Sequence, residues 1–184
     1  MIVVSGLPRS GTSMMMQMLQ AGGVPVIADD ARPADADNPR GYFEDARVRT
    51  LRRDAAWLRQ AGGHAVKIVS ALLEALPAGP RWDVLFLTRP IAAVLASQGV
   101  MLERRGERDG VSDADMAGHF ASHVARVRAA MTARDDVRWL DVPYDDVLTD
   151  PNGWANRVAT WLGPGLDVSA MAKAVEPSLR RHSR

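Results

Sequence analysis

The sequence of 184 residues contains no cysteine and very little lysine. Without cysteine, the chain has no disulfides, no thiolate nucleophile and no cysteine-based metal site. Of its 23 basic residues only Lys67 and Lys173 are lysines, and the others are arginines. Because arginine is used so generally, an arginine in this chain indicates function only where its position supports that role.

Net charge and long apolar runs are also limited. The formal net charge of +1 predicts no general attraction to nucleic acid or to membranes. No apolar run approaches the roughly 20 residues that span a bilayer. An apolar segment that already begins at Ile2 leaves no room for a signal peptide. We therefore expect a cytoplasmic protein with a single domain over residues 1–184, large enough for a proper core.

The most informative stretch lies at the start, from Ile2 to Ser13, and reads IVVSGLPRSGTS. Its apolar beginning predicts a buried strand, and the residues from Thr12 to about Ala21 predict a helix. A small-residue loop between a strand and a helix N-terminus is typical of an oxyanion site, because loop N–H groups and the helix dipole converge there.

The spacing of Gly6 and Gly11 is that of a Walker A loop, G-x-x-x-x-G-K-[ST]. However, Thr12 stands at the position of the Walker lysine. The loop therefore indicates an oxyanion site, but not the usual one for ATP.

The rest of the chain alternates between apolar runs and helical patterns. Residues 24–27, 64–69, 84–87 and 137–142 predict strands, 28–42 a polar loop, and 44–60, 72–76, 90–101, 113–131, 151–162 and 168–175 helices. This alternation predicts an α/β fold, a three-layer sandwich similar to P-loop NTPases. A mainly parallel sheet of about four to five strands would carry helices on both faces.

Ligands of such sheets bind at the carboxyl ends of the strands, where Arg9, Val69, Arg89 and Tyr144 follow predicted strands. Arg89 directly precedes a helix N-terminus, where a cation opposes the helix dipole unless an anion lies beside it. Ser97 lies roughly 10 Å further along that helix. We therefore expect two anion sites, one at the Arg9 loop and one at Arg89 and Ser97, and a ligand with two phosphate-type groups.

These motifs resemble those of sulfotransferases that use 3′-phosphoadenosine 5′-phosphosulfate (PAPS). In that family a loop of the type P-[KR]-x-G-T-[ST] cradles the 5′-phosphosulfate, and residues 8–13 match it throughout. The arginine form of the loop resembles the tyrosylprotein branch. Arg89 and Ser97 have the spacing of the family's pair for the 3′-phosphate. Later segments are similar in the expected order, namely Val142-Pro143-Tyr144-Asp145-Asp146-Val147, Asp150-Pro151 and Trp161-Leu162-Gly163.

The resemblance implies in-line transfer of a sulfonate from PAPS to a hydroxyl or amine of a small-molecule, carbohydrate or other acceptor, with no metal required. Arg9 and Lys67 would stabilise the leaving phosphate together with backbone amides of the loop. The residues implied to bind the donor are Arg9, Ser10, Gly11, Thr12, Ser13, Arg89, Ser97 and Tyr144.

The chain departs from the family at the catalytic base. Many members carry Lys-Thr-His at the third strand, whereas this chain has Lys67, Ile68 and Val69, so that valine replaces the catalytic histidine. Our candidate for the general base is Glu44, which lies where the long loop meets the next predicted helix. Further candidates for the base are Asp29, Asp30 and His64.

Two departures from the family leave alternatives open. The basic C-terminal segment of the family is missing in its usual form, and Arg180 and Arg181 are candidates to replace it. The chain is shorter than expected for the family, which suggests a trimmed acceptor side or a homodimer that completes it.

The alternative functions are a P-loop small-molecule or nucleotide kinase and a catalytically inactive nucleotide-binding module. His119 and His123 have the spacing of zinc ligands but no evident third ligand, so we expect no metal site.

Overall fold

The computed structural model describes residues 1–29, 35, 38, 40–106 and 112–176. Asp30, Arg180 and Arg181 lie outside these residues, so their predicted roles stay predictions. Among the described helices, none is both long enough and apolar enough to cross a membrane.

The centre of the molecule is a five-stranded sheet in which every strand is parallel to its neighbours. The spatial order is β2-β3-β1-β4-β5, which places the first strand in the middle. Val4 pairs with Lys67 on one side and with Leu85 on the other, and Gly6 pairs with Leu87. The strands are β1 (Ile2–Gly6), β2 (Val26–Ile27), β3 (Ala65–Lys67), β4 (Trp82–Thr88) and β5 (Val137–Pro143).

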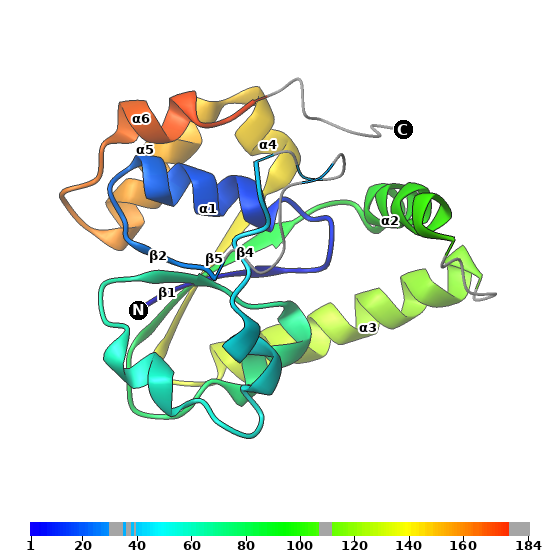
Figure 1. Ribbon diagram of the computed structural model, residues 1–184, viewed down its shortest axis with the longest axis horizontal. Helices are drawn as coiled ribbons and strands as arrows, with labels where there is room; N and C mark the ends of the chain where they lie inside the picture. The colour runs from blue at the N-terminus through cyan, green and yellow to red at the C-terminus, as the bar shows by residue number, and fades with distance from the viewer. Residues whose placement is uncertain (30–34, 36–37, 39, 107–111, 177–184) are drawn as a thin grey trace.

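Helices cover both faces of this sheet (Figure 1). One face carries α1 (Thr12–Ala21), α4 (Tyr144–Thr149), α5 (Pro151–Leu162) and α6 (Val168–Lys173). The other face carries α3 (Asp113–Thr132) and three short 3-10 helices, η1 (Ala46–Thr50), η2 (Ala56–Gln60) and η3 (Ser70–Ala75). Helix α2 (Ile91–Arg105) follows β4 and packs against α3. This architecture confirms the predicted three-layer, P-loop-like α/β fold.

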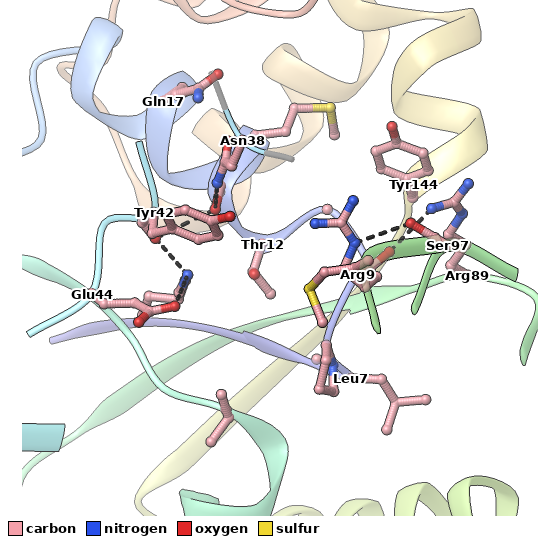
Figure 2. Close-up of a pocket in the computed structure, with 18 of the residues that line it drawn as sticks. Leu7, Arg9, Thr12, Gln17, Asn38, Tyr42, Glu44, Arg89, Ser97 and Tyr144 are labelled. Carbon is pink, nitrogen blue, oxygen red and sulfur yellow. Dashed lines mark hydrogen bonds and ion pairs between the residues drawn. The ribbon is translucent and has the colours of Figure 1, made fainter. Parts of the chain in front are cut away.

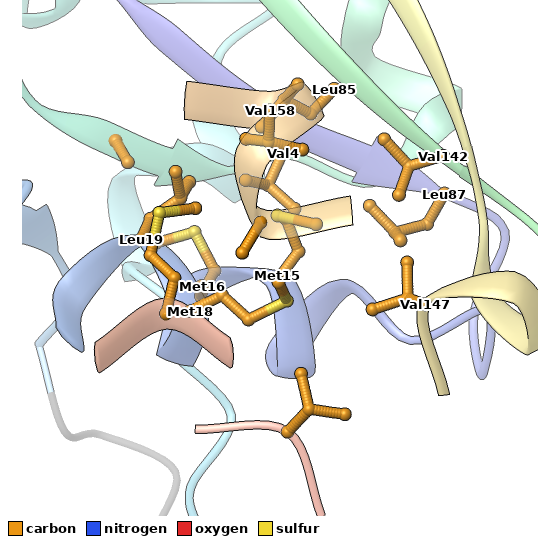
Figure 3. Packing of buried hydrophobic residues seen from close by; sticks show 14 of the residues in the cluster. Val4, Met15, Met16, Met18, Leu19, Leu85, Leu87, Val142, Val147 and Val158 are labelled. Carbon is orange, nitrogen blue, oxygen red and sulfur yellow. The ribbon is translucent and has the colours of Figure 1, made fainter. Parts of the chain in front are cut away.

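Two apolar clusters hold the layers together, because successive strand residues point to opposite faces of the sheet. Val4 belongs to the cluster under α1, in which Met15, Met16, Met18 and Leu19 are fully buried (Figure 3). Val3 points the other way and packs in the cluster formed with η1, η2, η3 and α3. The strand that leads into the Arg9 loop is therefore buried on both sides, which fixes the position of the loop.

The predicted helix over residues 44–60 is wrong. That segment instead forms η1 and η2, joined by an irregular turn. Acidic side chains explain the break: Asp45 accepts a hydrogen bond from the backbone N–H of Arg47 at 2.9 Å, and Asp54 accepts one from Ala56 at 2.9 Å. Such local side-chain bonds compete with the regular helical pattern. The short helix expected over residues 72–76 is η3, also of the 3-10 type, and α4 was not expected as a separate helix.

Candidate functional site

The site begins in the loop that joins β1 to α1. Gly11 has a φ of 98°, and a Cβ placed there would lie 2.3 Å from the Tyr144 ring. A Cβ at Gly6 would lie 2.4 Å from the hydroxyl of Ser10 and 2.7 Å from the carbonyl oxygen of Leu87. Both positions therefore require glycine, since real side chains do not make contacts this short. The predicted Walker-type spacing thus reflects two close approaches of this loop, one to Tyr144 at Gly11 and one to Leu87 at Gly6.

Most of the residues expected from the sequence line one pocket beside this loop. They are Arg9, Gly11, Thr12, Ser13, Glu44, Lys67, Arg89, Ser97 and Tyr144. Ser10 is the exception, because only 1% of its surface is exposed and its backbone N–H donates to the carbonyl of Leu7 at 3.2 Å. The loop thus turns the Ser10 side chain inward, under Gly6, and away from the pocket.

One side of the pocket is cationic. The Nε of Arg9 donates to the hydroxyl oxygen of Ser97 at 3.0 Å, and the guanidinium of Arg89 donates to the carbonyl oxygen of Arg9 at 3.1 Å (Figure 2). The guanidinium of Arg89 also lies over the Tyr144 ring, 4.8 Å from its centre. The two anion sites expected from the sequence are therefore in direct contact, through Arg9.

Arg9 itself has an uncommon backbone conformation. Its φ is 67°, in the left-handed region that residues with a Cβ rarely adopt. This turn directs its side chain toward Ser97 in α2. Since Ser97 is 3% exposed and accepts from Arg9, its own hydroxyl proton can be donated to a ligand atom in the pocket.

The opposite side of the pocket holds a lysine and a carboxylate. Lys67 lies at the end of β3, is 9% exposed, and donates to the carbonyl of Tyr42 at 2.5 Å and to Glu44 at 3.4 Å. The other carboxylate oxygen of Glu44 lies 3.9 Å from Arg49. Glu44 and Tyr42 stand across Thr12 from Arg9 and Arg89 (Figure 2). The pocket thus has Arg9 and Arg89 on one side and the Lys67–Glu44 pair on the other.

Asn38 and Tyr42 line the pocket beside the start of α1. Asn38 donates to the hydroxyl of Ser13 at 2.8 Å, and that hydroxyl lies 3.4 Å from the carbonyl of Tyr42. The phenol of Tyr42 donates to Asp35 at 2.7 Å. Arg40 bonds the carbonyl of Ala174 at 2.9 Å and pairs with Glu176. Sequence reasoning missed the roles of Asn38 and Tyr42, and the only signal was the long polar loop predicted over residues 28–42.

Two of the other candidate bases, Asp29 and His64, lie outside the pocket. The carboxylate of Asp29 accepts from the backbone N–H of Ala46 at 2.5 Å, and the ring of His64 contacts the carbonyl of Gly62 at 3.0 Å. Neither residue lines the pocket. Of the four candidates, Glu44 alone is a described residue that reaches it, which keeps Glu44 as our candidate.

The predicted pair of histidines on α3 is not brought into a metal cluster. His123 contacts the buried hydroxyl of Ser70 at 2.9 Å, which links η3 to α3. Burial, and then the charge of Arg126, lowers the pKa of His123. In the described part of the chain, no group of three or more His, Cys, Asp or Glu side chains could hold a metal ion.

Comparison with known proteins locates the fold. No protein-family model matches the chain, and no curated protein matches it. Among solved structures, a sulfotransferase from Alicyclobacillus acidocaldarius is similar over 97% of this chain and 87% of its own, with a TM-score of 0.51 and 18% sequence identity. The chain shares the fold of that sulfotransferase. An unliganded sugar kinase from Janibacter sp. HTCC2649 is similar over 98% of each chain, at 16% identity and a TM-score of 0.43.

Proposed function

We propose that the chain transfers a sulfonate group from PAPS to a hydroxyl or amine of an acceptor. The observation that carries this proposal is the pocket itself. It holds the cations of Arg9 and Arg89 beside Ser97 on one side of the loop, and Lys67 with Glu44 on the other. The fold shared with a sulfotransferase supports it.

The side chains present fit such a donor. Guanidinium groups match phosphate oxygens with paired N–H donors, so Arg89, with the Ser97 hydroxyl, suits the 3′-phosphate. The ring of Tyr144 holds Arg89 in place by a cation–π contact. Backbone N–H groups at the start of α1, in residues 11–13, suit the 5′-phosphosulfate. We also propose that the loop is of the type found in the tyrosylprotein branch, because it carries arginine at position 9 where the cytosolic branch carries lysine.

The chemistry that we propose needs a base and a cation on the leaving group. The acceptor oxygen would form a bond to sulfur while the bond from sulfur to the 5′-phosphate oxygen breaks. The acceptor proton would pass to Glu44, a contribution typically of about 10²–10⁴-fold. Lys67 and Arg9 would meet the charge that develops on the phosphate. Lys67 already contacts Glu44, so the cation that we propose for the leaving phosphate also lies next to the proposed base.

A small-molecule kinase is the second candidate, because it would use the same fold and the same glycine spacing. Thr12 argues against it, since a P-loop kinase uses the lysine at that position to hold the transferred phosphates. An inactive nucleotide-binding module is the third candidate, and valine in place of the family's catalytic histidine is the feature that favours it.

Thermal unfolding with two ligands tests the proposal. We expect 3′,5′-diphosphoadenosine, at about 100 times its Kd and without metal, to add about 2.7 kcal/mol of stability. For a chain of this size that raises Tm by roughly 5–10 °C. Arg89→Ala should reduce this shift strongly, whereas Arg53→Ala, at an exposed arginine outside the pocket, should not. A shift with Mg-ATP alone would favour the kinase, and diphosphate binding without turnover over a broad acceptor panel would favour the inactive module.

A further inference from the structure

The residue before the proposed base has a strained backbone. Phe43 has a φ of 52°, and in the described part of the chain Phe43 and Arg9 are the only residues other than glycine with a positive φ. A bulky side chain in this region is a genuine outlier. Such strain persists only where the surrounding contacts enforce it, and it is common at functional sites. The contacts that enforce the turn at Phe43 therefore bear on the site.

This turn brings two acceptors to one cation. The backbone carbonyl of Tyr42, just before the turn, accepts from the ammonium of Lys67 at 2.5 Å, and the carboxylate of Glu44, just after it, accepts at 3.4 Å (Figure 2). The Phe43 side chain packs against the apolar cluster under α1. Because Phe43 alone separates Tyr42 from Glu44, its backbone conformation decides whether both groups reach the same ammonium.

Asp29 holds the chain just after this turn at two points. Its backbone N–H donates to the carbonyl of Glu44 at 3.0 Å, and its carboxylate accepts from the backbone N–H of Ala46 at 2.5 Å. Asp29 is itself exposed and does not line the pocket. It therefore acts on the site through the backbone around Glu44, and not on a ligand.

Asp29 also connects the turn to the strands that carry Lys67. It lies two residues beyond the end of β2, where Ile27 pairs with Val66 of β3, and Lys67 is the next residue of β3. The carboxylate of Glu44 and the ammonium of Lys67 are thus held by two neighbouring strands. A shift of one relative to the other would have to disturb the bonds of Asp29.

We propose that Asp29 is a positioning residue for Glu44, which keeps that carboxylate beside Lys67 and directed into the pocket. The catalytic part of this inference rests on the proposed sulfotransferase function. Without the side-chain bond from Asp29, Phe43 would return to a negative φ and the Glu44 carboxylate would leave Lys67. A displacement of about 1 Å in a reacting group can cost about 10²-fold in rate.

Three variants isolate this role. Asp29→Ala removes the bond to Ala46, whereas Asp29→Asn keeps an oxygen that can accept it. Asp54→Ala is the matched control, because Asp54 is also exposed and its carboxylate accepts from the backbone N–H of Ala56 at 2.9 Å, at the start of η2. Asp29→Ala and Asp54→Ala should lower Tm to a similar extent, so stability alone cannot account for a difference between them.

Crystal structures of the wild type and the three variants measure the geometry without any acceptor. We expect a negative φ at Phe43 and no contact between Glu44 and Lys67 in Asp29→Ala, and both features as in the wild type in Asp29→Asn and Asp54→Ala. An unchanged φ at Phe43 and an unchanged Glu44–Lys67 contact in Asp29→Ala would overturn the proposal.

Turnover measures the consequence for the reaction. With PAPS as donor, the acceptors are 4-nitrophenol, benzyl alcohol, methyl glucoside and benzylamine. For each one that the wild type sulfonates, kcat should fall about 10²-fold in Asp29→Ala, while the KM for PAPS stays unchanged. Asp29→Asn and Asp54→Ala should stay within about threefold of the wild type. Equal losses of kcat in Asp29→Ala and Asp54→Ala would refute the positioning role.

The outcomes separate this inference from the function on which it rests. No stabilisation by 3′,5′-diphosphoadenosine would refute the sulfotransferase function, and the crystal structures would still decide whether Asp29 sets the turn. If the wild type sulfonates none of the four acceptors, the crystal structures decide in the same way. Stabilisation by the diphosphate with an unchanged kcat in Asp29→Ala would refute the role of Asp29 while the donor site stands.

Discussion

Arg9 is the residue whose removal tests most of the reasoning about the site. Its guanidinium bonds Ser97 through Nε, and its carbonyl accepts from Arg89. In Arg9→Ala the carbonyl and its bond stay, and only the side-chain cation is lost. Losing one donor to a developing oxyanion typically costs about 10²–10³ in kcat, or roughly 2.7–4 kcal/mol. We expect a loss of that size in sulfonate transfer, measured as release of 3′,5′-diphosphoadenosine.

The backbone of Arg9 supplies the control. Because its φ is 67°, alanine and arginine are strained alike there, whereas glycine is not. Arg9→Gly should therefore lose the same turnover as Arg9→Ala but be more stable by about 1 kcal/mol, which is roughly 2–4 °C in Tm for a chain of this length. Turnover within threefold of the wild type in both variants would remove Arg9 from the mechanism. Unequal turnover in the two variants would show that loop conformation, and not charge, carries the effect.

Two further predictions concern the loop and the acid stability of the fold. Gly11→Ala places a Cβ 2.3 Å from the Tyr144 ring at a φ of 98°. We therefore expect the free energy of unfolding, measured with denaturant, to fall by about 1–3 kcal/mol, and 3′,5′-diphosphoadenosine to bind more weakly. An unchanged free energy of unfolding and unchanged binding would contradict the close approach. The pKa of Asp136 is lowered to about 2 from 3.8, chiefly by its hydrogen bonds from Arg134. A lowered folded-state pKa contributes stability above the unfolded value and loses it as the pH falls from about 4 to about 2. Asp136→Asn should therefore be less stable at neutral pH and lose less stability over that acid range than the wild type, and equal losses would exclude this role.

The sequence predicted the fold well where its signals are local. The strand of residues 2–6 and the helix that follows are determined by an apolar run and by Gly6 and Gly11, where a side chain would clash with its neighbours. Both elements could therefore be predicted from the sequence. Residues 44–60 were misread as a helix because their apolar spacing ignores the bonds that Asp45 and Asp54 make to nearby backbone groups. The strand order is a matter of long-range pairing, which no local pattern contains.

The site was predictable to the extent that it is written in short motifs. Arg9 and Arg89 follow strands, Lys67 ends β3 and Ser97 lies in the helix after β4; all four line the pocket at one edge of the parallel sheet. The contribution of Asn38 could not be foreseen, because it depends on the contact of its side chain with Ser13 at the start of α1, which no local pattern contains. The inward turn of Ser10 was missed for a similar reason, since a motif letter does not say which way a side chain points.

The contact between Arg9 and Ser97 alters how the two anion sites should be understood. Spacing along the chain treats the loop after β1 and the arginine after β4 as separate sites for separate phosphates. In the structure, Arg89 bonds the backbone of Arg9, and Arg9 bonds the α2 residue Ser97, so each site helps to position the other. A phosphate that draws Ser97 toward itself acts on the Arg9 side chain, which we assign to the leaving group, and one that draws Arg89 acts on the Arg9 backbone. Binding at one end of the donor and stabilisation of charge at the other are then properties of one connected group, and residues in contact of this kind do not contribute additively.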